Sequence, residues 1–246
     1  MSDTTSTAPN GRFDGSRVFV TGAASGIGAA TVELFRAEGA RVVGVDVSAA
    51  DGVAHCDVTD PASVQSAMAA AVDELGGLDV CVNVAGINRF SRIEELSLDL
   101  LQAHLSVNLI GPMLVTQAAL PHLKESKGNV VTVASISGMQ GQPFNSAYCA
   151  SKGGVLLLMR SLAVELARHG VRVNCVCPGG VDTPLVAGSA ASLPPDVPPK
   201  FFDKMSGVMG GFMPPSDIAE AIGYLASPAA SSVTGASLVV DRGTLW

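Results

Sequence analysis

Short apolar runs alternate with segments of helical periodicity along almost the whole chain, and this alternation restricts the fold more than any other feature. The runs are Arg17–Val20, Arg41–Val45, Val53–Cys56, Leu78–Val82, Asn129–Val133, Val171–Val176 and Ala236–Val240. Several are apolar at consecutive positions, as expected for strands that face water on neither side. Buried strands separated by helices are typical of a parallel sheet covered on both faces. The sequence therefore predicts an α/β fold with a doubly wound parallel sheet of seven strands.

The chain of 246 residues is predicted to form a single domain, because no repeat or linker divides it. Residues 1–13 are polar and are expected to be a flexible tail, so the domain would span residues 14–246. Helices are expected at about 26–38, 61–75, 98–109, 112–124, 147–168 and 216–225. Asp60-Pro61 and Gly76-Gly77 bound the second of these helices with typical start and stop signals. Proline and glycine interrupt the alternation in residues 184–213, which we expect to be a mobile lid over a substrate.

Composition excludes several classes of protein. Hydrophobic residues make up 48% and charged residues 15% of the chain, so a large core is available. The net charge is −7 without a basic block, which argues against a nucleic-acid partner. The longest apolar run is too short to cross a bilayer and the N-terminus has no signal-peptide pattern, so we expect no membrane and a cytoplasmic location. The five cysteines form no CxxC pair and the four histidines are isolated, which favours free thiols and no metal site.

A glycine-rich turn joins the first predicted strand to the first predicted helix. The segment Thr21–Gly28 reads TGAASGIG, with Gly22, Gly26 and Gly28 in a GxxxGxG pattern. Glycines let the backbone approach a pyrophosphate, and the helix N-terminus supplies unpaired N–H groups. A simple strand-to-helix turn is the alternative explanation of the glycines alone. Asp46 ends the second strand, where a carboxylate would meet the adenosine ribose. The sequence therefore predicts a Rossmann-like dinucleotide site that prefers NAD.

A tyrosine and a lysine occupy one face at the start of the long helix. Tyr148 and Lys152 are four residues apart, and Ser135 ends the fifth strand 13 residues before Tyr148. A lysine ammonium beside a phenol lowers the phenol pKa, so Tyr148 could exchange a proton with an alcohol oxygen. An exposed Tyr/Lys pair on a helix is a common alternative, but the serine at the carboxyl edge of the same sheet favours a catalytic site.

Taken together, these motifs resemble those of the classical short-chain dehydrogenase/reductase family. TGAASGIG at 21–28, NVAG at 83–86, Asn108, the stretch from SISG to YCASK at 135–152 and PGGVDTP at 178–184 follow in the expected order. The resemblance runs from about residue 14 to the C-terminus. It implies an oxidoreductase that interconverts a secondary alcohol and a ketone by hydride transfer.

The resemblance also implies roles for individual residues. Tyr148 would be the acid/base, Ser135 would polarise the substrate oxygen, and Lys152 would lower the Tyr148 pKa and bind the nicotinamide ribose. Asn108 would kink its helix and hold a water in a proton relay with Lys152. The remaining cofactor-binding positions would be Gly22, Ser25, Gly26, Ile27, Gly28, Asp46, Asp57 at the adenine, Val58, Asn83 in the central strand, Ala85, Gly86, Pro178, Gly179, and Val181 and Thr183 at the carboxamide.

Two positions depart from the family pattern. Val84 replaces the second asparagine of NNAG, and Arg242 replaces the first glycine of a DGG motif. The charge at position 242 puts subunit contacts there in doubt. The long helix at 147–168 carries Leu156, Leu157, Leu158, Met159 and Leu162, more apolar surface than one buried face needs. In the family two such helices pair, so we expect a homotetramer.

Other functions and other pocket residues remain open at this point. A second hypothesis is an NADPH-dependent 3-oxoacyl thioester reductase of the same fold, which would favour a basic residue near the glycine-rich turn. A third is a non-catalytic dinucleotide-sensing protein, which would be expected to lack Ser135, Tyr148 or Lys152. The substrate itself is a small alcohol or carbonyl of unknown identity. Candidates for its pocket are Asn88, Arg89, Phe90, Gln140, Pro143 and Asn145.

Overall fold

A computed structural model describes residues 11–198 and 207–245 of the chain. Its strands form one seven-stranded sheet in the order β3-β2-β1-β4-β5-β6-β7, and every neighbouring pair is parallel. The strands are β1 Arg17–Thr21, β2 Arg41–Asp46, β3 Val53–His55, β4 Val80–Asn83, β5 Asn129–Val133, β6 Arg172–Pro178 and β7 Ser237–Val240. The predicted doubly wound, Rossmann-like parallel sheet is confirmed.

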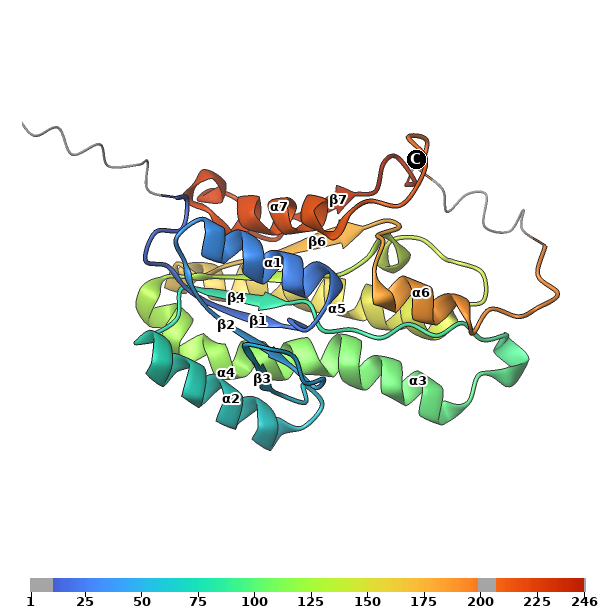
Figure 1. The fold of residues 1–246 in the computed structure, drawn as a ribbon, viewed down its shortest axis with the longest axis horizontal. Coiled ribbons are helices and arrows are strands. Elements are labelled where there is room, and N and C mark those ends of the chain that lie inside the picture. The colour runs from blue at the N-terminus through green and yellow to red at the C-terminus, as the bar shows by residue number, and fades with distance from the viewer. Residues whose placement is uncertain (1–10, 199–206, 246) are drawn as a thin grey trace, which may run out of the picture.

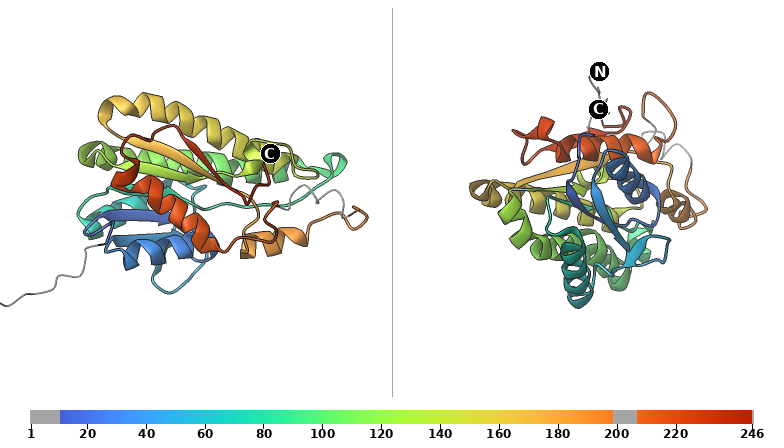
Figure 2. Two further views of the ribbon diagram at one scale, coloured as in Figure 1. Left: turned by 90° about the horizontal axis from the view of Figure 1, so that it is seen from above. Right: turned by 60° about the vertical axis from the view of Figure 1, so that its left-hand side comes forward.

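Helices cover both faces of the sheet (Figure 1). The helices α1 (Gly26–Ala37) and α7 (Pro215–Ala226) pack side by side on one face. On the other face lie α2 (Pro61–Leu75), α4 (Gly111–Ser126) and α5 (Ser146–Leu166). The short helix α6 (Pro184–Ala190) stands at the end of the sheet where the parallel strands finish (Figures 1 and 2).

The buried side chains form one apolar cluster on each side of the sheet. Phe19, Met68, Leu123 and Met159 belong to the cluster beneath α2, α4 and α5. The cluster beneath α1 and α7 is built around Phe35. Because strand residues point alternately to the two faces, the apolar runs Val18–Val20 of β1 and Val80–Val82 of β4 contribute to both clusters. This explains why their sequences lack an alternation of apolar and polar residues.

The local signals at the ends of α2 are confirmed. Asp60 is extended and its side chain accepts a hydrogen bond from Ala62 N, with Pro61 at the first helical position. At the other end Gly76 adopts the left-handed conformation with φ of 75°, which glycine takes without steric cost.

The two helices expected at 98–109 and 112–124 are in fact one almost continuous helical run. An α-helix, α3 (Leu98–Leu105), passes into a π-helical segment, Ser106–Ile110, and then into α4. Gly111 and Pro112 do not break the run, because proline is tolerated in the first turn of the segment that it opens. Asn108 lies within the π-helical segment, where the helix widens.

By length and composition alone, the run Leu98–Ser126 could also cross a membrane, with 29 residues and a mean hydropathy of 1.3. A single helix of this kind is weak support for a membrane protein, because core helices of soluble proteins meet the same criterion. The expected lack of a membrane therefore stays a prediction.

The folded domain begins earlier than residue 14, the boundary predicted from the sequence. Phe13 is buried, and its ring packs against Phe35 with centroids 4.5 Å apart. Its amide donates to Glu38 O at 3.1 Å. Residues 11–13 therefore belong to the domain, because one aromatic side chain anchors an otherwise polar segment. Residues 1–10 and 199–206 and Trp246 lie outside the described residues, and so does the middle of the predicted lid.

Candidate active site

A cavity in the described part of the chain lies at the carboxyl ends of the parallel strands. β1 is flanked by β2 and β4, so the chain reverses its direction across the sheet between β1 and β4. In open α/β sheets ligands bind at this reversal point. The first cavity has a volume of about 370 Å³ and is lined by the turn before α1, the ends of β2 and β4, and the start of α6.

The glycine-rich turn approaches other backbone segments more closely than a side chain would allow. A Cβ on Gly22, whose φ is +69°, would lie 2.7 Å from Ala85 N. A Cβ on Gly28 would lie 1.9 Å from Gly22 O, so the first turn of α1 rests directly on the turn before it. Ser25 precedes α1 without capping it through its side chain. The N–H groups of the first helical turn therefore point to the cavity without side-chain competition, as a pyrophosphate site requires.

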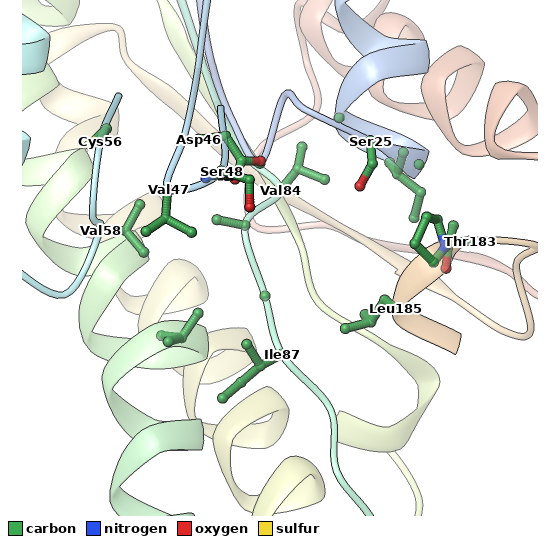
Figure 3. A pocket seen from close by; sticks show the side chains of 18 of the residues that line it. Ser25, Asp46, Val47, Ser48, Cys56, Val58, Val84, Ile87, Thr183 and Leu185 are labelled. Carbon is green, nitrogen blue, oxygen red and sulfur yellow. Dashed lines mark hydrogen bonds between the residues drawn. The ribbon is translucent and has the colours of Figure 1, made fainter. Parts of the chain in front are cut away.

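Asp46, the last residue of β2, lines the first cavity (Figure 3). One carboxylate oxygen accepts from Ala24 N at 3.1 Å and the other accepts from Ser48 N at 2.8 Å. These two contacts fix the carboxylate between the glycine-rich turn and the end of β2. Each oxygen keeps a further lone pair for another donor, such as a ribose hydroxyl.

The two sides of the first cavity are formed by different segments. In Figure 3, Val47, Cys56 and Val58 stand on one side and Ser25, Thr183 and Leu185 on the other. Asp57 also lines the cavity, and hydrogen bonds from Thr59 N and then Thr59 Oγ1 lower the pKa of its carboxyl. Of the predicted cofactor residues, the cavity brings together Gly22, Ser25, Gly26, Ile27, Gly28, Asp46, Asp57, Val58, Ala85, Gly86 and Thr183.

Six predicted cofactor residues lie outside the wall of this cavity, and two of them, Tyr148 and Lys152, are described with the second cavity below. Asn83 is buried in β4, and its amide donates to Thr116 and Thr132 hydroxyls at 3.3 and 3.2 Å. It therefore joins the central strand to its neighbours, as expected. Pro178 ends β6 and Val181 is buried, so both shape the surrounding backbone. Gly179 lines a second cavity instead.

The second cavity, of about 300 Å³, is lined by two of the predicted catalytic residues, Ser135 and Tyr148. Ser135 follows β5, and its Oγ lies 3.0 Å from Ser137 Oγ. Tyr148 is in the first turn of α5, where its ring packs edge-on against that of His104. A hydrogen bond joins the side chains of Tyr148 and Ser135. The structure therefore brings a phenol and a hydroxyl to one point in the cavity wall, as two donors to a single substrate oxygen would need.

The predicted lowering of the Tyr148 pKa is wrong for this arrangement. Burial raises the pKa of the phenol to about 12, and the hydrogen bond to Ser135 opposes this only in part. Lys152 Nζ lies 5.7 Å from the centroid of the Tyr148 ring and donates to Val133 O at 2.9 Å. Burial also lowers the pKa of Lys152 to about 8. The phenol is thus a neutral proton donor at neutral pH.

Asn108 is completely buried beneath the loop that follows β4. Its Oδ1 accepts from Ile87 N at 2.9 Å, and its Nδ2 donates to Ile87 O at 2.9 Å and to Ser151 Oγ at 3.0 Å. The π-helical segment presents Asn108 to both α5 and this loop, and such segments are frequent at functional sites. Asn108 therefore ties the loop to the helix that carries Tyr148 and Lys152.

The remaining wall of the second cavity comes from segments far apart in the sequence. The expected residues Asn88 and Phe90 line it, whereas Arg89, Gln140, Pro143 and Asn145 do not. Gln142, which was not predicted, lines the cavity where Gln140 and Pro143 were expected. The apolar wall consists of Ile136, Val186, Ala190, Leu193 and Phe212, of which all but Ile136 belong to the segment 184–213 that was predicted to lie over the substrate. Apart from Tyr148, no titratable side chain is found among the described residues that line this cavity.

Comparisons with known proteins agree with this geometry. A family model described as enoyl-(acyl carrier protein) reductase matches residues 22–244. The cis-4-hydroxycyclohexanecarboxylate dehydrogenase of Sinomonas cyclohexanicum is 44% identical over 240 residues, covering 91% of this chain and 94% of that protein. The 2,5-dichloro-2,5-cyclohexadiene-1,4-diol dehydrogenase of Sphingobium indicum is 38% identical, with 94% and 97% covered.

Among solved structures of similar fold, some contain NAD or NADH and others contain NADP. The 3-ketoacyl-(acyl-carrier-protein) reductase of Brucella melitensis, complexed with NADH, has a TM-score of 0.84 and 32% identity, with 94% of this chain and 99% of that chain covered. A short-chain dehydrogenase from Burkholderia cenocepacia in complex with NADP has a TM-score of 0.85 and 29% identity, with 95% and 99% covered. The comparisons thus agree on a nicotinamide dinucleotide. The choice between NAD and NADP has to be argued from the residues of the site.

Proposed function

Because the chain belongs to the short-chain dehydrogenase/reductase family, we propose that it interconverts a secondary alcohol and a ketone with NAD as the cofactor. The observation that carries the proposal is the second cavity, where Tyr148 and Ser135 meet beside the first cavity at the strand ends. The chain is an oxidoreductase with alcohol and diol dehydrogenases among its relatives. What we propose beyond this general activity is the preference for NAD and the use of Tyr148 as the acid/base.

The residues of the site would divide the work. Bound NAD would exchange the hydride, and the glycine-rich turn with Asp46 would hold its pyrophosphate and ribose. Ser135 would donate a hydrogen bond to the substrate oxygen, and Tyr148 would exchange a proton at that oxygen. Lys152 would hold the cofactor ribose next to Tyr148, while Asn108 would link α5 to the loop after β4 and support a proton relay. The lid at 184–213, of which α6 is part, would exclude water from the transfer.

Turnover of a panel of alcohols tests this function. The panel contains cyclohexanol, meso-2,3-butanediol and cis-4-hydroxycyclohexanecarboxylate, each with NAD⁺ and with NADP⁺, and absorbance at the nicotinamide band measures the rate. We expect at least one neutral secondary alcohol to be oxidised, because the described wall of the second cavity is mostly apolar. Failure of every alcohol and of the matching ketones would contradict the proposal.

We expect NAD to be preferred over NADP by about ten- to thirtyfold in kcat/KM. Asp46 is fixed by Ala24 N and Ser48 N and cannot easily swing away from a 2′-phosphate. Two like charges about 4 Å apart repel by roughly 4 kcal/mol at an effective dielectric constant of 20. If solvent screening leaves about 1–2 kcal/mol, the preference is of the stated size.

The double substitution Asp46→Ala with Val47→Arg should reverse this preference, because Val47 is exposed and lines the same cavity. Asp46→Asn is the matched control: it keeps an acceptor oxygen and removes the charge, so it should lose discrimination without gaining NADP affinity. Equal use of both cofactors by the wild type would refute the role of Asp46.

A 3-oxoacyl thioester reductase is the second candidate, because one structural neighbour is a 3-ketoacyl-(acyl-carrier-protein) reductase and the matching family model is described by another acyl thioester reductase, an enoyl-(acyl carrier protein) reductase. Such an enzyme would reduce an acetoacetyl thioester with NADPH faster than it oxidises any alcohol of the panel with NAD⁺. Asp46 argues against the NADPH form, since no basic side chain lines the described wall of the first cavity. The same panel, extended by acetoacetyl-CoA, therefore distinguishes the two functions.

We expect a homotetramer that pairs the exposed face of α5. Leu157 and Val164 are seven residues apart on this helix and are 66% and 82% exposed in the single chain. Burying such a side chain contributes about 1.5–3 kcal/mol. The double substitution Leu157→Glu with Val164→Glu should therefore dissociate the assembly. Light scattering at micromolar concentration measures the mass. Leu98→Glu, on α3 and also 66% exposed, is the control and should leave the mass unchanged. A wild-type monomer would contradict the expectation.

A further inference from the structure

Arg242 follows the last strand in a backbone conformation that side chains rarely adopt. Its φ is +53°, in the left-handed region where Cβ crowds the carbonyl oxygen. Glycine takes this conformation without steric cost, and Gly243 next to it does so with φ of +76°. A non-glycine residue held in this region suggests that its side chain has a function that offsets the strain.

The Arg242 side chain reaches the segment 207–213, which precedes α7. Nη1 donates to Gly210 O at 3.0 Å, and Nη2 lies 3.9 Å from Asp217 Oδ2 in the first turn of α7. The main chain adds a contact, because Met209 N donates to Arg242 O at 3.2 Å. The C-terminal turn and this segment run side by side at the strand ends (Figure 2). One residue thus holds the segment through both its side chain and its main chain.

The same segment carries Phe212, an aromatic part of the second cavity's wall. Its ring lies on Gly180, where a Cβ would be 2.6 Å from Phe212 Cδ1. Beyond it, Met213 N donates to Gly180 O at 3.0 Å. Phe212 is 60% exposed, so packing holds its ring on one side only. The position of the ring therefore depends on the path of the chain between Gly210 and Met213, the two points where hydrogen bonds fix it.

We propose that Arg242 is a positioning residue for substrate selection, which holds Gly210 so that Phe212 completes the wall of the second cavity. The proposal rests on the proposed function, in which this cavity binds the alcohol. Arg242 touches neither Tyr148 nor Ser135 in any described contact, so its loss should change the binding of the alcohol rather than the proton exchange at its oxygen.

The substitution Arg242→Asn tests this, because asparagine tolerates the left-handed conformation but cannot reach Gly210. We expect the KM for cyclohexanol to rise about fivefold, the factor that one hydrogen bond of this kind contributes. The kcat and the KM for NAD⁺ should stay within about twofold, and Arg242→Lys should restore part of the KM. Amide exchange at Met209, Gly210 and Met213 should become faster in Arg242→Asn.

Repeating the substitution in a Phe212→Ala variant distinguishes an effect on the position of Phe212 from an effect on the stability of the whole protein. In Phe212→Ala, the further change Arg242→Asn should leave the KM unaltered, because two residues that act through one contact are not additive. Unchanged exchange at Met209 and Gly210, or a KM effect that persists without the Phe212 ring, would overturn the proposal. Amide exchange detects the Arg242 contact without any turnover. An inactive wild type would therefore contradict the proposed function but not this contact.

Discussion

The substitution Tyr148→Phe is expected to lower kcat by about 10²–10⁴-fold, the range that general acid–base catalysis contributes. Phenylalanine keeps the ring, which is buried against His104, and removes only the hydroxyl that bonds to Ser135. No other described side chain in the wall of the second cavity titrates, so no other group in that wall can exchange the proton. Affinity for NADH, measured by its fluorescence, should remain nearly unchanged.

Tyr224→Phe is a matched control, because the chain contains only two tyrosines and Tyr224 lies on the outside of α7. It should retain wild-type kcat. If Tyr148→Phe keeps more than a tenth of wild-type kcat, Tyr148 is not the acid/base. The pH dependence gives a second readout. With a phenol pKa of about 12, the protonated form dominates at neutral pH, so ketone reduction should proceed there and alcohol oxidation should accelerate as the pH rises from 7 to 10.

The fold could be predicted largely from the sequence because its strands are buried on both faces. Adjacent apolar residues in β1, β2 and β5, such as Val18 and Phe19, point to opposite faces of the sheet and leave neither face to solvent, so the apolar runs themselves mark the strands. Asp60-Pro61 and Gly76 mark the ends of α2 for local reasons that need no tertiary contact. Phe13 shows the limit of this reasoning. A single aromatic residue in a polar segment carries no periodicity, and only its contact with Phe35 includes it in the domain.

The catalytic pair was predictable from spacing, whereas its electrostatics were not. Four residues along a helix bring Tyr148 and Lys152 to one face whatever surrounds them. The pKa of Tyr148 depends first on its burial, and Lys152 donates to Val133 O; only the packed structure determines both. The segment 184–213 was predicted to lie over the substrate, but for a similar reason the sequence did not show which of its residues line the second cavity. Phe212 reaches it through a fold-back over Gly180 that no local pattern indicates.

Lys152→Met is expected to abolish turnover and at the same time to stabilise the protein at neutral pH. Lys152 is only 4% exposed, and in the described part of the chain it forms no ion pair, donating one hydrogen bond to Val133 O. Burial of the ammonium lowers its pKa from the ordinary value of 10.5 to about 8. Burying this charge therefore lowers the free energy of unfolding. Methionine, which has a similar length and no charge, does not have this cost.

The sign and the pH window follow from the two pKa values. Between about pH 8 and 10.5 the unfolded chain binds the proton more tightly than the folded one, so wild-type stability rises with pH in this interval. Below pH 8 the whole cost is present, and the difference between the two values corresponds to roughly 3 kcal/mol. Leaving Val133 O without its donor costs about 1–3 kcal/mol, which offsets part of the gain.

At pH 7 we therefore expect Lys152→Met to raise Tm by about 2–4 °C, as about 1 kcal/mol does for a chain of this size. The gap to the wild type should shrink as the pH rises from 8 to 10, because the wild type alone loses the cost of the charge. Lys124→Met, at an exposed position of α4, is the control and should keep a gap that does not change over this range. Calorimetric scans of the three proteins at pH 7 and pH 10 measure both quantities. A gap for Lys152→Met that is the same at both pH values would show that folding does not lower the pKa of Lys152, so that burial of its ammonium carries no cost.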